Sequence, residues 1–252
     1  MSKLSRRQLI ATGAMTAAGA GGLAVAAKLA RRYGLVPPDS AGIYGPGETL
    51  TYAAQRLLTR HSMAREFSRG QISAKPLQNE VAPLGEEFAR LQQANFADWR
   101  LTVDGTVARP TTFSLAELRS LPRHSHITMI QCEEGWSYIA EWTGVPLQHV
   151  LTLVGAAPET THVVYRSFQK EWWESMDMAD ALHPQTLLAL EMNGGELPVG
   201  FGGPLRMRVT RQLGYKSVKY VTHLTVTDNI KQFGNGLGAA SPEAGYAWYA
   251  GI

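Results

Sequence analysis

Residues 96–227 carry short segments of strand and helix periodicity that follow one another without a regular strand–helix–strand repeat. Strand patterns lie at 101–103, 126–132, 163–168, 187–192, 205–209 and 220–227, and helix patterns lie at 114–121, 146–154 and 178–182. A doubly wound parallel sheet needs a helix after nearly every strand, so this pattern favours an α+β fold. Residues 96–230 are expected to form one main domain.

Three local signals mark turns and helix starts within this pattern. Asp104-Gly105 follows an alternating apolar segment and predicts a strand that ends in a hairpin turn. Ser114 and Glu117 have the spacing of a capping box, which predicts that a short helix begins there. Pro146 precedes apolar residues spaced i, i+3, i+4 and i+7, which predicts a helix with one buried face.

The composition is that of a globular protein and argues against a nucleic-acid partner. The 252 residues, 44% of them hydrophobic and 18% charged, are enough to bury a substantial core. The net charge of +3 equals the charge of Lys3, Arg6 and Arg7 alone, so the remaining chain is neutral. The basic stripe with interleaved aromatic residues that nucleic-acid binders carry is absent from the sequence.

Residues 1–30 have the pattern of an export signal. Arg6 and Arg7 precede a stretch that contains no charge up to Lys28 and is rich in Ala and Gly. This resembles a twin-arginine signal, which is read by an export machinery that moves folded proteins. Residues 24–26 offer an A-x-A cleavage site. An uncleaved membrane anchor, or a chance arginine pair before an ordinary transmembrane helix, are the alternatives.

The segments that flank the main domain have less regular patterns. Residues 31–95 are rich in Pro, Gly, Ser and Gln, which predicts an extended arm that packs on the domain and contains a short helix over 52–65. Residues 231–252 contain several glycines and are expected to form a mobile tail.

Cys132 is the only cysteine in the sequence and ends the strand pattern at 126–132. A lone thiol excludes an intrachain disulfide, a CxxC zinc site and a CxxCH haem attachment, and is ordinarily a small buried hydrophobe. Glu133 and Glu134 follow directly, and nearby carboxylates disfavour a nucleophilic thiolate. A bound high-valent metal would reverse this effect because its charge stabilises a soft thiolate ligand. A base partner such as His124 or His126 remains an alternative.

Several blocks of the sequence occur in the order that is typical of one family. They are residues 101–107 (LTVDGTV), 113–118 (FSLAEL), 132–137 (CEEGWS), 142–147 (WTGVPL), 183–193 (HPQTLLALEMN), 203–206 (GPLR) and 213–219 (LGYKSVK). Together they resemble the molybdopterin-binding domain of the sulfite oxidase superfamily. The resemblance covers roughly residues 67–228 and is closest to the exported bacterial branch that includes the catalytic subunit of periplasmic methionine sulfoxide reductase. It implies the mixed α+β fold of that superfamily, preceded by an extended arm.

The resemblance also implies a cofactor site. Cys132 would be the protein's ligand to molybdenum in a molybdenum–molybdopterin cofactor, and the metal would cycle between Mo(VI) and Mo(IV) during oxygen-atom transfer. Arg206 and the turn Gly214-Tyr215-Lys216 match the positions that hold the pterin phosphate, which needs fixed cations and backbone amides. The other residues that the resemblance places near the cofactor are Asn79, Ser167, Ser217 and Lys219.

Some of these residues also have ordinary structural interpretations, and two positions depart from the family pattern. Without the resemblance, Arg206 and Lys219 would be interpreted as solvated ends of strands. Trp136 would be interpreted as a packing residue, whereas the resemblance leads us to predict a pocket residue. Classical sulfite oxidases follow the cysteine with basic residues that receive an anionic substrate, so the acidic pair at 133–134 argues against sulfite. Phe201 stands where relatives place His or Asn, which removes a polar contact.

The sequence thus predicts an exported molybdenum–pterin oxidoreductase that transfers an oxygen atom to or from a small S-oxide, sulfite-like or related substrate. The alternatives are a non-catalytic exported binding protein on the same fold and a cysteine-thiol enzyme. No haem-binding motif follows residue 227, so electrons are expected to pass to or from a separate partner, such as a membrane haem b subunit or a cytochrome. The expected location is the periplasm, either free or held by an uncleaved anchor.

Overall fold

The computed structural model describes residues 28, 30, 34–42, 45–79, 83 and 85–252. The arginine pair at Arg6 and Arg7 and the uncharged stretch 8–27 lie outside the described residues. Within the described part of the chain, no helix combines the length and the apolar character needed to span a membrane.

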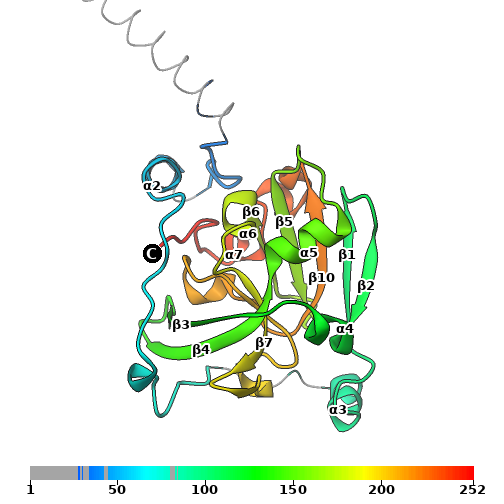
Figure 1. The fold of residues 1–252 in the computed structure, drawn as a ribbon. Helices are drawn as coiled ribbons and strands as arrows, with labels where there is room; N and C mark the ends of the chain where they lie inside the picture. Colours follow the sequence, from blue (N-terminus) through cyan, green and yellow to red (C-terminus); the bar gives the residue numbers. More distant parts are fainter. Residues whose placement is uncertain (1–27, 29, 31–33, 43–44, 80–82, 84) are drawn as a thin grey trace, which may run out of the picture.

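Two five-stranded sheets form the centre of the molecule (Figure 1). The first has the order β2-β1-β10-β5-β6, in which only the β1–β10 pair is parallel. Its strands are β1 (Arg100–Gly105), β2 (Thr111–Ser114), β5 (His162–Ser167), β6 (Trp173–Asp177) and β10 (Val221–Thr227). Strands that are distant in sequence therefore lie side by side, as expected for a mixed α+β domain and unlike a doubly wound sheet.

The second sheet is antiparallel and has the order β3-β4-β7-β8, with β9 paired to β7. Its strands are β3 (His124–Gln131), β4 (Ser137–Pro146), β7 (Leu187–Met192), β8 (Gly195–Glu196) and β9 (Arg206–Arg208). Strand β4 is not among the strands that the sequence pattern predicted. Most of its residues are buried in consecutive positions, so it lacks the alternation that reveals a half-exposed strand.

Short helices cover the core that the two sheets share. They are α3 (Glu86–Gln93), α4 (Leu115–Ser120), α5 (Leu147–Val154) and α6 (Met178–Ala181). Leu147, Val150, Leu151 and Val154 of α5 are all buried in the main cluster, which confirms the predicted apolar face. The predicted capping box of α4 is also present, because Ser114 and Glu117 hydrogen-bond to each other's backbone amides.

The predicted strand and hairpin are present, because β1 pairs antiparallel with β2, but the turn does not lie at Asp104-Gly105. Both residues belong to β1, where they pair with Thr225 and Val226 of the parallel neighbour β10. The chain reverses between Gly105 and Thr111, the first residue of β2. Thr111 then pairs with Val103 of β1. A parallel partner from 120 residues further along the chain thus extends the strand through a sequence that usually turns.

The arm contains α2 (Gly45–Leu58), a 3-10 turn η1 (Arg69–Gln71) and α3. The helix expected over 52–65 is therefore displaced toward the N-terminus. Residues 64–67 run instead along the edge strand β3, where the Phe67 amide donates to Ile127 O at 2.9 Å and the Ala64 amide donates to Gln185 Oε1 at 2.8 Å. These tertiary hydrogen bonds prevent the helix from continuing.

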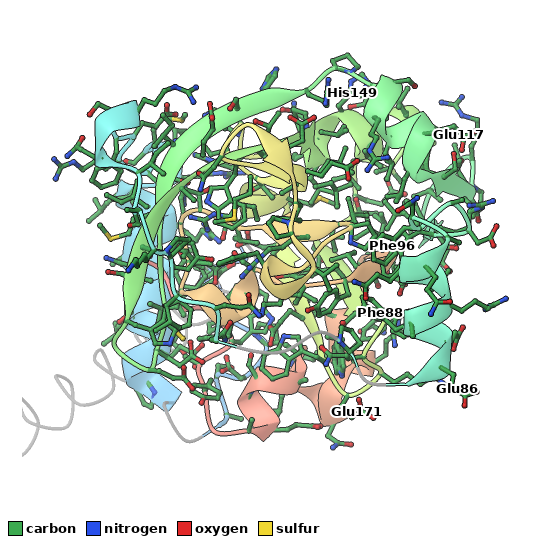
Figure 2. The ribbon with its side chains drawn as sticks, turned by 90° about the horizontal axis from the view of Figure 1, so that it is seen from below. Glu86, Phe88, Phe96, Glu117, His149 and Glu171 are labelled. Atoms are coloured by element: carbon green, nitrogen blue, oxygen red, sulfur yellow. The ribbon has the colours of Figure 1, made fainter. Side chains whose placement is uncertain are left out.

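Helix α3 was not expected within the arm. Glu86 and Glu87 lie in its first turn, where carboxylates interact favourably with the helix dipole. Phe88 and Leu91 share one face and are buried in the core. Figure 2 shows Phe88 and Phe96 directed inward, whereas Glu86 lies at the outside of the helix.

The C-terminal segment is packed against the domain, so the prediction of a mobile tail is wrong. It contains η4 (Ile230–Gln232), η5 (Gly234–Gly236) and α7 (Ala240–Glu243). Trp248 is 1% exposed and donates from Nε1 to Ser175 Oγ at 2.7 Å. Tyr249 and Trp248 also contact Tyr52 of α2, with ring centroids 4.9 and 5.8 Å apart. Aromatic burial of this size outweighs the backbone freedom of the glycines.

Candidate active site

Cys132 lies in the tight turn that joins β3 to β4. The Cys132 amide donates to Trp136 O at 2.9 Å, and the Gly135 amide donates to Cys132 O at 3.1 Å. Gly135 has a φ of +90°, which a residue with a side chain rarely adopts. The turn therefore holds the thiol at the end of a rigid hairpin.

The surroundings of Cys132 keep its thiol protonated. Its Sγ lies 3.2 Å from Glu133 Oε2 and 3.8 Å from Glu134 Oε2. Burial and the adjacent carboxylate of Glu133 raise the pKa of Cys132 to about 12. Trp136 Nε1 donates to Glu134 Oε2 at 2.7 Å and so fixes one of these acids. A free thiol nucleophile is disfavoured here, whereas a cation bound to the sulfur would reverse the balance.

A second wall of the site is the 3-10 turn η3 (Gly214–Lys216), which packs directly against the end of β3. A Cβ added at Gly214 would lie 3.2 Å from Gln131 O and 3.7 Å from Cys132 Cα. The close approach of the two backbones therefore favours a glycine at this position. Tyr215 is held in the same turn by a hydrogen bond from its hydroxyl to Ala247 O at 2.5 Å.

Cations lie beside this turn, and backbone carbonyls orient them. Arg206 donates from Nε to Ser217 O at 3.0 Å and from Nη1 to Phe201 O at 2.8 Å. Lys219 Nζ donates to Gly200 O at 3.0 Å. These carbonyl groups fix the orientation of two basic side chains that line the same wall, and fixed basic side chains are the groups that bind a phosphate.

A cavity of ≈ 420 Å³ lies between the two walls. Eight of the residues that the sequence predicted for the site line it, namely Asn79, Cys132, Trp136, Arg206, Gly214, Tyr215, Ser217 and Lys219. The structure thus brings together residues from the arm, the β3–β4 turn, β9 and η3. The volume lies in the ~300–1,000 Å³ range of small-molecule and cofactor sites.

Ser167 and Lys216, which the sequence also predicted for the site, do not line the cavity. Ser167 Oγ accepts a hydrogen bond from the Gln169 amide at 3.0 Å, and Gln169 does line the cavity. Lys216 Nζ lies 2.6 Å from Glu174 Oε2, and both side chains are fully buried. The side chain of Lys216 is therefore unavailable to a phosphate, and the prediction of that contact is corrected.

Lys216 instead fixes the turn to two other elements. Its backbone carbonyl accepts a hydrogen bond from the Tyr165 hydroxyl at 2.8 Å, and its partner Glu174 accepts a bond from the Ser241 amide at 3.2 Å. The Lys216 ammonium also lies 5.3 Å from the ring centroid of Trp248. One ion pair thus joins the site turn to β6 and to the C-terminal segment.

The cavity contains further residues that were not predicted for the site. The additional lining residues are Ile130, Glu133, Glu134, Gln169, Glu171, Trp172 and Val218. Gln169, Glu171 and Trp172 belong to the β5–β6 connection, and Figure 2 shows Glu171 at the edge of the molecule. Their only sequence signal is their place just after the Ser167 strand.

The residues present suit an anionic cofactor that also carries a metal cation. Arg208 is buried behind the cation wall, and among the described residues its hydrogen-bond partners are neutral, including Met129 O at 2.6 Å and Thr128 Oγ1 at 3.3 Å. Within the same part of the chain its Nε has no hydrogen-bond partner. The guanidinium groups of Arg206 and Arg208 suit a phosphate, and the Cys132 sulfur on the opposite wall suits a metal cation, whose charge would stabilise the thiolate.

The fold and the cavity define a class of protein, namely one that holds an anionic cofactor between a cation-rich wall and a lone cysteine. The family model described as oxidoreductase molybdopterin binding domain matches residues 89–233, more than half of the chain. The chain therefore belongs to this family of molybdopterin-binding oxidoreductases, and its cofactor is molybdenum–molybdopterin.

Two relatives are similar to more than half of the chain. A candidate protein-methionine-sulfoxide reductase subunit, YedZ1, from Azospira oryzae is 37% identical over 161 residues, covering 64% of this chain and 59% of the relative. The protein-methionine-sulfoxide reductase catalytic subunit MsrP of Xanthomonas campestris is 32% identical over 149 residues, covering 53% of this chain and 46% of the relative. The chain thus spans about half to three-fifths of the length of these relatives.

A solved structure has a similar fold. The sulfane dehydrogenase SoxCD from Paracoccus pantotrophus matches with a TM-score of 0.52 and 21% sequence identity, covering 67% of this chain and 46% of that chain. At this identity the similarity shows the fold alone. It confirms the mixed α+β architecture that the sequence predicted.

Proposed function

We propose that this chain is the catalytic part of an exported molybdenum enzyme that reduces S-oxides, with methionine sulfoxide as the substrate class. The single observation that carries the proposal is the cavity in which Cys132 faces the wall of Arg206 and Lys219. The names of the relatives support the substrate class, because they are protein-methionine-sulfoxide reductase subunits.

The residues of the cavity divide into groups with different tasks. Arg206 and Lys219 hold the pterin phosphate, together with the backbone of η3 and the side chains of Asn79 and Ser217. Cys132 is the thiolate ligand of the metal. When bound, the cofactor supplies the two-electron chemistry of oxygen-atom transfer.

The remaining lining residues form a rim that faces the substrate. Trp136 and Trp172 provide apolar surface, and Glu133, Glu134 and Glu171 give the rim a negative charge. An anion such as sulfite is repelled by these carboxylates, whereas a neutral sulfoxide is not. The rim therefore favours a thioether S-oxide over sulfite.

The reaction consumes two electrons and two protons for each sulfoxide, and yields one thioether and one water. The carboxylates at the rim can relay these protons from solvent into the cavity, and Trp136 and Trp172 limit the access of bulk water. The electrons come from a separate partner, which we propose to be a membrane haem subunit or a cytochrome.

Two alternatives account for the same fold without this activity. A non-catalytic exported binding protein would hold the cofactor or another anion without turnover. A cysteine-thiol enzyme would be active without molybdenum, although the raised pKa of Cys132 opposes a thiolate nucleophile.

The decisive experiment compares protein made in strains with and without molybdopterin synthesis. We expect about one molybdenum per chain and reduction of methionine sulfoxide by a dye electron donor only in the competent strain, with sulfite oxidation much slower. Protein that contains molybdenum but reduces no S-oxide would favour the alternative of a non-catalytic binding protein. Equal activity in both strains would favour the thiol enzyme.

Export is tested separately from catalysis. Replacing Arg6 and Arg7 by lysine is expected to leave folded, cofactor-loaded protein in the cytoplasm, because a receptor reads the arginine pair. Fractionation with activity staining measures this outcome. Unchanged delivery to the periplasm would show that the segment is a different signal or an ordinary anchor.

A further inference from the structure

Helix α2 has an unusual surface, because the face that it turns away from the domain carries no charge. The exposed positions of the helix are Pro46, Gly47, Leu50, Thr51, Ala54, Leu57 and Leu58. Leu50, Leu57 and Leu58 are 72%, 68% and 82% exposed, respectively. At 100° per residue, Leu50, Ala54, Leu57 and Leu58 fall within an arc of roughly 100° and form one apolar stripe.

The opposite face of α2 is fixed to the domain. Arg56 pairs with Asp177 and Asp180 at 2.7 Å, and the Tyr52 hydroxyl donates to Asp177 Oδ2 at 2.6 Å. Both α2 side chains are buried. The helix therefore cannot rotate to hide its leucines without breaking a buried ion-pair network, so the apolar stripe is a permanent feature of the surface.

The chain passes close to this stripe as it leaves toward the N-terminus. A cavity of ≈ 580 Å³ is lined by Gly34, Leu35 and Val36 together with Leu57 and Arg60 of the α2 region. Figure 1 shows α2 at the margin of the molecule, apart from both sheets and beside the segment that contains residues 34–42. In the sequence, the uncharged stretch 8–27 precedes this segment.

Exposed basic residues follow α2 in the chain. Arg60 is exposed two residues after the end of the helix, and Met63, 51% exposed, and Arg65, also exposed, come next in the sequence. The adjacent carboxylate of Glu66 is paired with His126 and Gln185 at 2.8 and 3.0 Å. The only acidic residue of α2 is Glu48, which is buried and accepts a hydrogen bond from the Tyr249 amide. Leucines flanked by arginines, without an exposed carboxylate on the helix, are typical of a helix that lies in the headgroup region of an anionic membrane.

We propose that the α2 stripe is a membrane-docking surface, which inserts Leu50, Leu57 and Leu58 between the headgroups of anionic phospholipids. No α2 residue lines the cavity, so the docking surface and the cofactor site are made of different residues. The enzyme would then work at the membrane surface, where a membrane-bound electron donor is available, whether or not the N-terminal segment is retained.

The test uses the full cofactor-loaded chain and vesicles that contain phosphatidylglycerol and phosphatidylethanolamine. Hydrogen–deuterium exchange is followed in residues 45–58 with and without vesicles, so that binding through the N-terminal segment alone cannot be mistaken for docking of α2. We expect exchange in this peptide to slow by about tenfold on the vesicles. The variant L50S/L57S/L58S should lose that protection, and the matched variant L77S/L153S/L182S, which alters three other exposed leucines, should keep it.

Two outcomes would overturn the proposal. One is unchanged exchange of residues 45–58 on vesicles to which the protein binds. The other is protection that occurs only when the vesicles contain a membrane haem protein, which would make the stripe a protein-binding surface. Thermal unfolding of both triple variants shows that the comparison is made between folded proteins.

Discussion

The two walls of the cavity carry opposite charges and differ in how their side chains are held. On the wall formed by the β3–β4 turn, Cys132 is surrounded by the carboxylates of Glu133 and Glu134. On the other wall, Arg206 and Lys219 are oriented by backbone carbonyls. The acidic wall suppresses thiolate formation until a cation binds, whereas the cationic wall is prepared for an anion in advance.

This contrast suggests a division of labour between the walls. Contacts on the cationic wall act on how tightly the cofactor is held, and contacts on the acidic wall act on what the bound cofactor does. Lys216 belongs to neither group, because its side chain is buried with Glu174 and supports the turn from behind. Variants on the two walls and behind the turn should therefore be separable by three measurements, namely metal content, turnover per bound metal and stability.

The largest effect is expected for Cys132→Ser. A hard hydroxyl is a poorer donor than a thiolate to a redox-active metal, so turnover per bound metal should fall by at least about 100-fold. Metal analysis, dye-linked assay and circular dichroism on the same preparation measure loading, activity and fold. If a Cys132→Ser protein that contains molybdenum turned over at the wild-type rate, Cys132 on the acidic wall would have no part in the chemistry.

Lys216→Met should affect stability more than chemistry. The substitution leaves the carboxylate of Glu174 buried without its cation, which typically costs about 3–5 kcal/mol. Urea denaturation of the cofactor-free protein measures this loss, and the double variant Glu174→Gln/Lys216→Met should recover part of it. If the Lys216→Met protein were stable but contained no molybdenum, Lys216 would be a contact of the cofactor after all.

Arg206→Ala should lower cofactor occupancy and leave turnover per bound metal close to that of the parent. Loss of a charge-assisted hydrogen bond costs roughly 1.5–3 kcal/mol, which corresponds to about a 10- to 150-fold weaker hold on the phosphate. Trp136→Ala, on the opposite wall, provides the matched comparison, with full metal content and altered turnover or KM. Full loading of Arg206→Ala would mean that the phosphate is held elsewhere.

The elements that the sequence predicted well are those whose signals are local. The capping box of Ser114 and Glu117 and the apolar face of α5 depend only on residues within one or two helical turns. Strand β7 was predicted at its observed bounds, because Leu187–Met192 is a short apolar run that ends at a typical turn, Asn193-Gly194.

The features that the sequence did not predict depend on distant partners. Lys216 could not be distinguished from Arg206 as a phosphate ligand, because its partner Glu174 lies in β6, a strand that the sequence did not reveal. The buried face of α2 likewise depends on Asp177 and Asp180, more than 120 residues away. Gln169 and Glu171 reach the cavity through the β5–β6 connection, whose path no local pattern specifies.

The smallest effect is expected for Glu171→Gln, which removes one charge from the rim while keeping the shape of the side chain. Because Glu171 is exposed, solvent screens its field, and the change in KM should be only about two- to threefold. The direction of the change depends on the substrate. KM should rise for a methionine sulfoxide peptide flanked by lysines and should fall for one flanked by aspartates, with kcat unchanged for both. The effect should fade as salt is added.

Glu159→Gln, which changes an exposed glutamate away from the cavity, provides the control. Equal changes for the two peptides would show that Glu171 acts through the shape of the rim, and the charge contrast between the walls would then not extend to the substrate.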